Sequence, residues 1–199
     1  MTLIVVRHGR TAANASGRLL GRIDPPLDET GRAQAAALAS SLARSNPGAV
    51  VISSPLARTR ETADAIAVAL GATASIDARW IELDYGELDG MPLADIPSEV
   101  WASWRADSGF APPGGESLLA LGERVRAACD EAAGVARAGD VVVVTHVSPV
   151  KAALLWALGV EDSVGWRAYV APGSITRIDC RASGPVLLAF NTTPSTMPD

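Results

Sequence analysis

The sequence predicts an α/β fold, a three-layer α/β/α sandwich whose central sheet is mostly parallel. Residues 3–6 and 141–144 are unbroken runs of branched aliphatic side chains, which are typical of strands covered on both faces. Segments with apolar residues at helical spacing separate such runs, so strands and helices alternate along the chain. The 199 residues contain no linker, internal repeat or low-complexity block, which predicts a single domain over residues 1–199.

Apolar periodicity, and the residues that interrupt it, predict the individual elements. Strands are expected over residues 3–6, 49–52, 74–76, 141–144, 174–179 and 186–190. Helices are expected over residues 29–44, from the turn at 53–55 to about 70, over 117–137 and over 149–158. Residues 14–26 are expected to be a loop and the polar C-terminal tail to be frayed.

Helix starts are predicted from residues that can accept hydrogen bonds from free backbone amides. Asp28 and Ser117 are expected to be N-caps. Residues 53–55 are expected to cap the helix that follows them, and Ser148 is expected to be an N-cap with Pro149 at the first helical position.

Residues 83–115 are predicted to be an insertion that lies over a site as a lid. The segment 79–90 fits neither the helical nor the strand period, and helical fragments around Trp101 and Trp104 follow it. Irregular segments of this length in a compact domain often carry function.

Composition narrows the class of protein. The net charge of −5 argues against a general nucleic-acid surface, because such surfaces usually carry a basic patch. No apolar run approaches the roughly 20 residues that span a bilayer, so no membrane partner is expected. The chain starts without a signal-peptide pattern, which makes a cytoplasmic location the default expectation.

The chain has two histidines, and both directly follow a valine-rich strand. A lone histidine is more often structural than catalytic, but the paired positions of His8 and His146 predict a shared site. Arg7 and Arg58 flank them, which favours a pocket for a dianionic phosphate group. A zinc site would need a third and a fourth ligand, and the arginines would repel the cation, so no metal or cofactor is expected.

A neutral imidazole in such a pocket can attack phosphorus and form a phosphohistidine. Guanidinium groups and helix N-terminal amides would stabilise the charge on the transferring group. The leaving oxygen also needs a proton, and both Glu82 and Glu87 are available in the irregular loop to donate it.

Residues 7–11 together with Asn14 resemble the Arg-His-Gly-x-Thr-x-x-Asn signature of the histidine phosphatase superfamily, which also contains cofactor-dependent phosphoglycerate mutases. Further segments resemble that family in the same order, at residues 17–18, 24–27, 31–35, 53–58, 82–90, 114–117 and 144–146. The resemblance covers about nine-tenths of the chain. It implies the phosphoglycerate mutase-like α/β/α fold.

The resemblance also implies roles for individual residues. His8 would be the nucleophile and Glu82 the proton donor, while Arg7, Arg58 and His146 would hold the phosphoryl group. Further substrate contacts are expected from Asn14, Gly21, Arg22 and Val147. The alternative reading is purely structural, with Arg7 a solvated strand end, Arg58 half of a surface ion pair and Glu82 an exposed loop acid.

Two departures from the family pattern bear on the activity. Val147 and Ser148 stand where Gly-Gly is common, a pattern that looks closest to the alpha-ribazole phosphatase and acid phosphatase branch. The acid loop reads Glu82-Leu83-Asp84-Tyr85-Gly86, without the Arg and His of the mutases. These features favour a metal-independent phosphatase for a small phosphorylated metabolite. Phosphoglycerate mutase and a catalytically silent phospholigand-binding protein are the alternatives, and an edge strand near the C-terminus would allow a homodimer.

Overall fold

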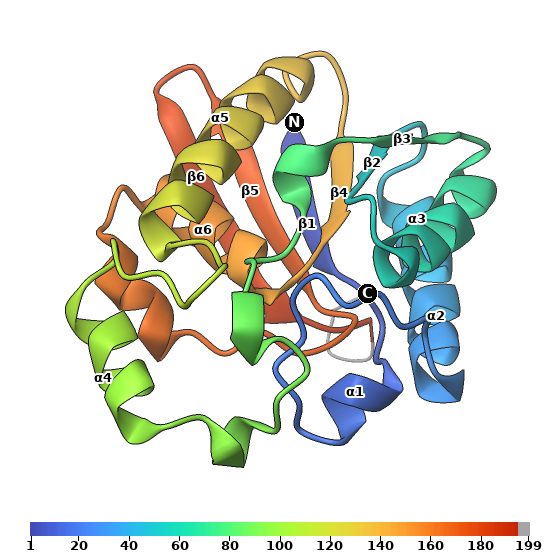
Figure 1. Ribbon diagram of the computed structural model, residues 1–199. Helices are drawn as coiled ribbons and strands as arrows, with labels where there is room; N and C mark the ends of the chain where they lie inside the picture. Colours follow the sequence, from blue (N-terminus) through green and yellow to red (C-terminus); the bar gives the residue numbers. More distant parts are fainter. Residues whose placement is uncertain (195–199) are drawn as a thin grey trace.

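A six-stranded mixed sheet forms the centre of the fold in the computed structural model, which describes residues 1–194 (Figure 1). The strands lie in the order β3-β2-β4-β1-β5-β6. The four strands β1, β2, β3 and β4 are parallel to one another, whereas β5 pairs antiparallel with both β1 and β6. All six predicted strands are confirmed, as β1 (Thr2–Arg7), β2 (Val50–Ser53), β3 (Ala74–Ile76), β4 (Val141–Thr145), β5 (Ile175–Arg181) and β6 (Gly184–Thr192).

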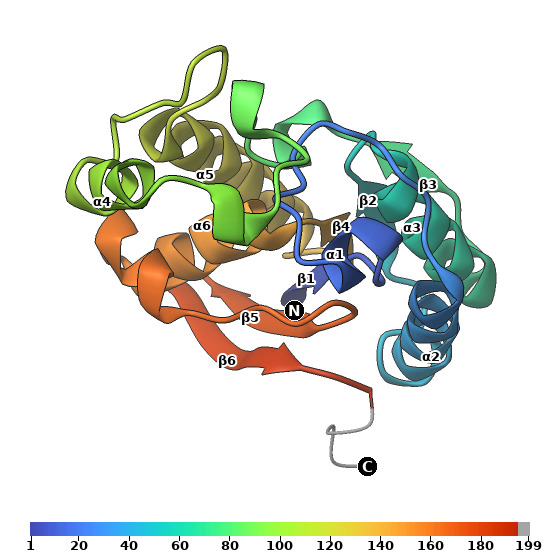
Figure 2. The same cartoon turned by 60° about the horizontal axis from the view of Figure 1, so that its bottom comes forward.

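Helices cover both faces of this sheet, which confirms the three-layer arrangement (Figures 1 and 2). Alternate residues of β1 divide between two cores: Ile4 and Val6 pack with α2 and α3, and Leu3 and Val5 pack with α5 and α6. The six helices are α1 (Ala12–Ala15), α2 (Glu29–Ser45), α3 (Ala57–Leu70), α4 (Ser98–Ala106), α5 (Leu118–Val135) and α6 (Val147–Leu158).

The pairing of β1 with β4 brings the two histidine loops together. Arg7 lies opposite Thr145, and the backbone amide of His8 donates a hydrogen bond of 2.9 Å to the carbonyl of Thr145. His8 and His146 therefore leave adjacent parallel strands at the same level, at the carboxyl edge of the sheet, where α/β folds place ligands.

Three local predictions are wrong. α6 begins at Val147 with His146 as its N-cap, so Ser148 and Pro149 lie inside the first turn. α3 has Leu56 as its N-cap without a side-chain bond, because the hydroxyl of Ser54 contacts His146 instead. The loop predicted from residue 14 starts later, because the chain up to Ala15 forms the short helix α1. A capping box stabilises the N-terminus of this helix. The capping roles of Asp28 and Ser117 are confirmed, with bonds from the amides of Gly31 and Ala120.

The segment 83–115 contains two 3₁₀ turns, Gly86–Leu88 and Leu93–Asp95, and the helix α4. Its side chains Ile96 and Trp104 form a small hydrophobic cluster with the buried Leu19 from the loop after α1. Its function as a lid stays a prediction. The predicted domain, residues 1–199, and the predicted frayed tail both include residues 195–199. These residues lie outside the described part of the chain.

None of the helices between residues 1 and 194 is both long and apolar enough to cross a membrane. β6 forms one edge of the sheet and exposes about half of Leu188 (54%). Pairing of two copies through this edge stays a prediction.

Candidate active site

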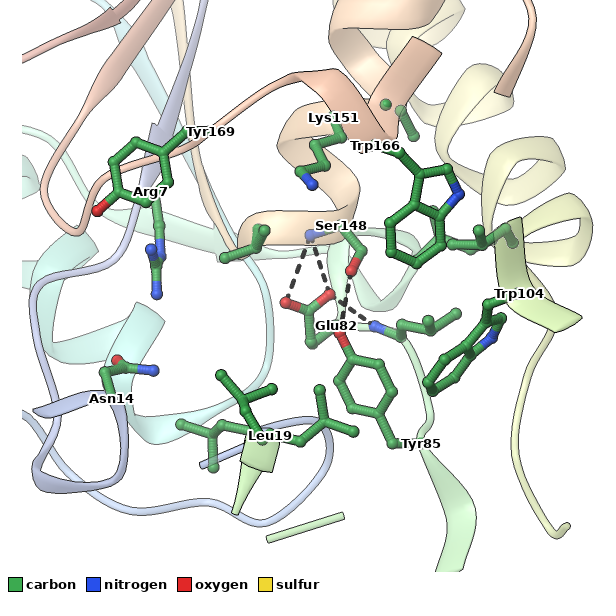
Figure 3. A pocket seen from close by; sticks show the side chains of 18 of the residues that line it. Arg7, Asn14, Leu19, Glu82, Tyr85, Trp104, Ser148, Lys151, Trp166 and Tyr169 are labelled. Carbon is green, nitrogen blue, oxygen red and sulfur yellow. Dashed lines mark hydrogen bonds between the residues drawn. The ribbon is translucent and has the colours of Figure 1, made fainter. Parts of the chain in front are cut away.

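A cavity of about 500 Å³ opens where β1 and β4 end (Figure 3). Five of the predicted site residues form part of its wall: Arg7, His8, Asn14, Glu82 and Val147. Four others do not line it: Gly21, Arg22, Arg58 and His146. The predicted residues thus divide into a group that faces the cavity and a group that supports it.

The buried ring of His8 (2% exposed) has a defined protonation pattern. Its Nδ1 lies 2.6 Å from the carbonyl oxygen of Gly9, which can only accept, so Nδ1 carries the proton. Burial, and then the charges of Arg58 and Arg7, lower the pKa of His8 well below its usual value. The ring is therefore neutral near pH 7, and Nε2 keeps a free lone pair.

Arg7 is the buried cation in the cavity wall. One of its terminal nitrogens donates to the carbonyl of Val170 at 2.6 Å, whereas its buried Nε has no partner among the described residues. Burial lowers the pKa of Arg7 to about 10, which leaves the guanidinium charged at neutral pH. An unpaired buried N–H of a cation is costly, and an anionic ligand would offset that cost.

His146 and Arg58 are completely buried next to His8. The rings of the two histidines lie 5.1 Å apart, edge to face. The Nε of Arg58 donates to Nδ1 of His146 at 3.2 Å, so the proton of His146 is on Nε2, which lies 2.7 Å from the hydroxyl of Ser54. Burial and the charge of Arg58 lower the pKa of His146.

The other nitrogens of Arg58 donate to backbone carbonyls of the loop after α1, those of Gly21 at 2.7 Å and Ile23 at 2.9 Å. Arg58 and His146 thus form hydrogen bonds with protein groups. Their direct contact with a phosphoryl group stays a prediction, and it would require Arg58 to exchange one of these acceptors.

Glu82, which the family resemblance implies as the proton donor, and Glu87 of the same loop differ in their burial. Glu82 is buried in the cavity wall (3% exposed), and its carboxylate accepts hydrogen bonds from the amides of Leu83 at 2.8 Å and Ser148 at 3.2 Å (Figure 3). Glu87 is exposed and does not line the cavity. The geometry therefore favours Glu82.

Asn14 presents its amide nitrogen to the cavity (Figure 3), because its oxygen accepts from the amide and hydroxyl of Thr11. Gly21 and Arg22 have other partners: the carbonyl of Gly21 holds Arg58, and Nε of Arg22 donates to the carbonyl of Glu82 at 3.0 Å. A side chain at position 21 would also collide with the backbone of Leu83. These placements give Gly21 and Arg22 supporting positions beside the site.

Two groups that support the site could not be identified from the sequence. The carboxylate of Asp89 accepts from three successive amides, those of Gly21, Arg22 and Ile23, at 2.7 to 2.8 Å. It thereby fixes the loop that holds Arg58. Isolated loop acids give no signal of such a role in a single sequence.

Arg124 of α5 is the second such group. Its guanidinium forms a bidentate pair with Glu116 at 2.7 and 2.8 Å, and it donates to the carbonyls of Arg79 and Ile81 at 2.6 and 2.7 Å. These bonds anchor the start of the acid loop to a long helix. Arg124 therefore positions Glu82 without touching the cavity.

Replacement of Asp89 by alanine is expected to lower kcat/KM roughly 10- to 100-fold, because small displacements of positioning groups are costly to catalysis. Two partly buried amides and one exposed amide would also lose their acceptor, so the free energy of unfolding should fall by about 1–3 kcal/mol. Steady-state kinetics and urea unfolding measure the two effects. Asp95→Ala, which removes an exposed acid from the same insertion, is the matched control, and equal activities of the two variants would contradict the role of Asp89.

The two histidines also predict how stability depends on pH. Both pKa values are lowered in the folded state, whereas an unfolded histidine titrates near 6.5. The unfolded chain therefore binds more protons below pH 6.5, and the free energy of unfolding should fall as the pH decreases from 6.5 to 5, with a slope approaching about 2.7 kcal/mol per pH unit for two groups.

Urea unfolding in phosphate-free buffer at several pH values measures this slope. The depressed pKa values of Asp28, Asp77 and Asp179 act only at lower pH, where unfolded carboxylates take up protons. A constant stability between pH 6.5 and 5 would show that the histidines are charged in the folded protein.

The fold and the site together define a protein that handles phosphoryl groups. Residues 3–193 match the family model described as histidine phosphatase superfamily (branch 1), so the chain belongs to that superfamily. The resemblance stated from the motifs is confirmed, as is the phosphoglycerate mutase-like fold.

Curated relatives agree with this family. The chain is 35% identical to a bifunctional protein of Mycobacterium tuberculosis over 185 residues. The aligned region covers 92% of this chain and 51% of that protein. The chain thus spans about half the length of the first of these relatives. It is also 33% identical over 188 residues to a probable phosphoglycerate mutase of Yersinia pestis, covering 92% of this chain and 86% of the relative.

Solved structures with the same fold include several named as phosphatases. A mycobacterial glucosyl-3-phosphoglycerate phosphatase in complex with VO₃ superimposes with a TM-score of 0.87 at 28% identity, over 96% of this chain and 99% of that one. A putative alpha-ribazole-5'-P phosphatase of Escherichia coli gives 0.85 at 24% identity, over 96% of each chain, which shows a shared fold.

Proposed function

We propose that the protein is a metal-independent phosphatase that hydrolyses small phosphomonoesters through a phosphohistidine on His8. One observation carries this proposal: His8, whose pKa is lowered and whose Nδ1 proton is held by the carbonyl of Gly9, lines the same cavity as Arg7, whose Nε has no partner among the described residues. A nucleophile and a cation for the phosphoryl oxygens therefore share one wall.

In the first step, the lone pair of His8 Nε2 forms a bond to phosphorus as the ester P–O bond breaks. Glu82 in its protonated form gives its proton to the leaving oxygen, so the product is a neutral alcohol. Arg7 holds the equatorial oxygens of the phosphoryl group, while Arg58 adds positive potential from its buried position.

In the second step, a water molecule attacks the phosphohistidine. The carboxylate of Glu82 takes a proton from this water, a P–O bond forms, and the P–N bond breaks with its electron pair returning to Nε2. Inorganic phosphate leaves, and both His8 and Glu82 regain their starting protonation. No external reactant other than water is consumed.

The test is to trap the intermediate. Purified protein treated with excess chelator and a ³²P-labelled monoester should release inorganic phosphate and, after rapid denaturation, carry acid-labile and base-stable label on the peptide that contains His8. Absence of both label and phosphate release would favour the silent phospholigand-binding alternative. Label on another residue would overturn the assigned nucleophile.

Phosphoglycerate mutase is the second candidate, because curated relatives carry that name. The acid loop argues against it, since a mutase must shield phosphohistidine from water and therefore needs further cationic contacts. Incubation with 3-phosphoglycerate and a trace of its bisphosphate distinguishes the two. We expect release of phosphate, whereas isomerisation without hydrolysis would favour the mutase.

A further inference from the structure

The cavity has two chemically different ends. In Figure 3, Arg7 and Asn14 lie on one side of Glu82, and Trp104 and Trp166 lie on the other. The first side holds the phosphate chemistry described above. The whole cavity, about 500 Å³, is far larger than a phosphate group needs, so its second side must receive the group to which the phosphate is attached.

Apolar side chains from five parts of the chain form this second side, which we call the apolar sleeve. They come from the loop after α1, from α4 and α5, from α6 and from the 3₁₀ segment Asp162–Arg167. The main members are Leu19, Trp104, Leu118, Leu121, Leu155 and Trp166. Leu19, Trp104, Leu121 and Leu155 are at most 7% exposed, so the sleeve is built into the core.

Aromatic contacts keep the sleeve in shape. Trp101 packs on Trp104 with ring centroids 5.5 Å apart and on Trp166 at 6.2 Å, and Tyr85 meets Trp104 edge to face at 5.8 Å. Interlocked rings of this kind hold a pocket open without a ligand. A preformed apolar pocket binds apolar groups with little cost in ordering.

Charged groups near the sleeve are already engaged or face the other way. Arg105 stacks on Trp101 and Trp166, 5.9 and 5.6 Å from the ring centroids. Asp162 pairs with Arg126 at 3.5 Å. Lys151 has no carboxylate partner among the described residues. Its ammonium lies 5.9 Å from the ring centroid of Trp166 and points toward Glu82, so it stands where the sleeve meets the phosphate side (Figure 3).

This arrangement penalises polar alcohols. A sugar or glycerate moiety in the sleeve would give up the water around its hydroxyl or carboxylate groups and find indole rings and leucine methyl groups in return. An unpaired hydroxyl buried in this way costs free energy, whereas a methylene group gains it.

We propose that the substrates are phosphomonoesters of apolar alcohols, with an alkyl or arylalkyl group of about six to eight carbon atoms in the sleeve. The inference rests on the proposed phosphatase activity and adds the chemical class of the leaving alcohol. Lys151 and Glu82 then lie at the junction, where the ester oxygen separates the charged group from the apolar one.

The experiment compares phosphates of primary alcohols only, so that the intrinsic reactivity of the leaving group is matched. Ethyl, butyl and hexyl phosphate form the apolar series, and glycerol 3-phosphate and glucose 6-phosphate are the polar counterparts. We expect kcat/KM to rise roughly two- to fourfold per added methylene, mainly through KM. Hexyl phosphate should exceed both polar substrates by at least tenfold.

A series that is flat, or faster hydrolysis of glycerol 3-phosphate than of butyl phosphate, would overturn the inference and leave the phosphatase activity standing. If none of the five substrates is hydrolysed, the proposed function is overturned, and the inference with it. The two failures are therefore distinguishable.

Two variants assign the effect to the sleeve. Trp166→Ala and Leu118→Gln change half-buried members on separate elements, so a folding defect in one leaves the other informative. Each should lower the ratio of kcat/KM for hexyl over ethyl phosphate by at least fivefold. Trp156→Ala is the matched control, because Trp156 lies on α6 outside the cavity with its indole N–H donating to Asp130. An equal loss of the ratio in the control variant would overturn the assignment.

Discussion

Replacement of His8 by alanine is expected to lower the rate of phosphate release by at least about 10⁴-fold, the scale found when a catalytic nucleophile is removed. In the part of the chain that the structure describes, His8 has the only imidazole nitrogen without a protein partner, because both nitrogens of His146 contact Ser54 and Arg58. The variant loses this nitrogen. Release of inorganic phosphate and ³²P labelling measure the effect, and no phosphohistidine should form.

His146→Ala is the informative comparison, since it removes the second histidine of the same site. We expect it to keep some labelling on His8, because His146 supports the site from a buried position. Thermal unfolding of both variants shows whether the fold survives. Activity of His8→Ala within tenfold of the parent protein would assign the nucleophile to another group.

Replacement of Glu82 by glutamine should separate the two chemical steps. Glutamine keeps an oxygen that can accept from the amides of Leu83 and Ser148 but cannot donate the acid proton. With an alkyl phosphate, whose leaving oxygen needs that proton, the rate should fall about 10²- to 10⁴-fold. With 4-nitrophenyl phosphate, whose leaving group needs none, the first step should stay fast.

Rapid-mixing kinetics of Glu82→Gln with 4-nitrophenyl phosphate should therefore show a burst of one equivalent of nitrophenol. A slow steady state and accumulated phosphoenzyme should follow, because the variant also lacks the base for water attack. Glu87→Gln changes the exposed acid of the same loop and should behave like the parent protein. Equal losses on the alkyl and nitrophenyl substrates, without a burst, would contradict the role of Glu82 as the acid.

The sequence was sufficient to predict the sheet and a shared site for Arg7 and His8, which line one cavity. Residues 3–6 and 141–144 have no polar alternation, which makes their assignment as buried strands secure, and each leads directly into a histidine. Parallel neighbours end at the same edge, so two such strand ends were enough to predict a shared pocket. The family resemblance chose Glu82 over Glu87, and the burial of Glu82 in the cavity wall agrees with that choice.

Supporting contacts could not be predicted because their partners are distant along the chain. Ser54 and Ser148 look like helix caps locally, but one bonds to His146 and the other gives its amide to Glu82, and these tertiary partners displaced both helix starts. Asp89 reaches a loop 66 to 68 residues away. The sleeve is likewise a product of packing, since tryptophans and leucines in the sequence read equally well as ordinary core.

The matched level of Arg7 and Thr145 on neighbouring strands has a consequence for how this architecture diversifies. His8 and Arg7 are positioned by the ladder between β1 and β4, which the segment 83–115 does not form. That segment instead supplies Trp104 and other side chains that meet the organic part of a substrate. Exchanging only the part of the insertion around α4 between members of the superfamily, with Leu83 and Asp89 kept, would thus transplant preference for an alcohol while the reacting groups stay in place.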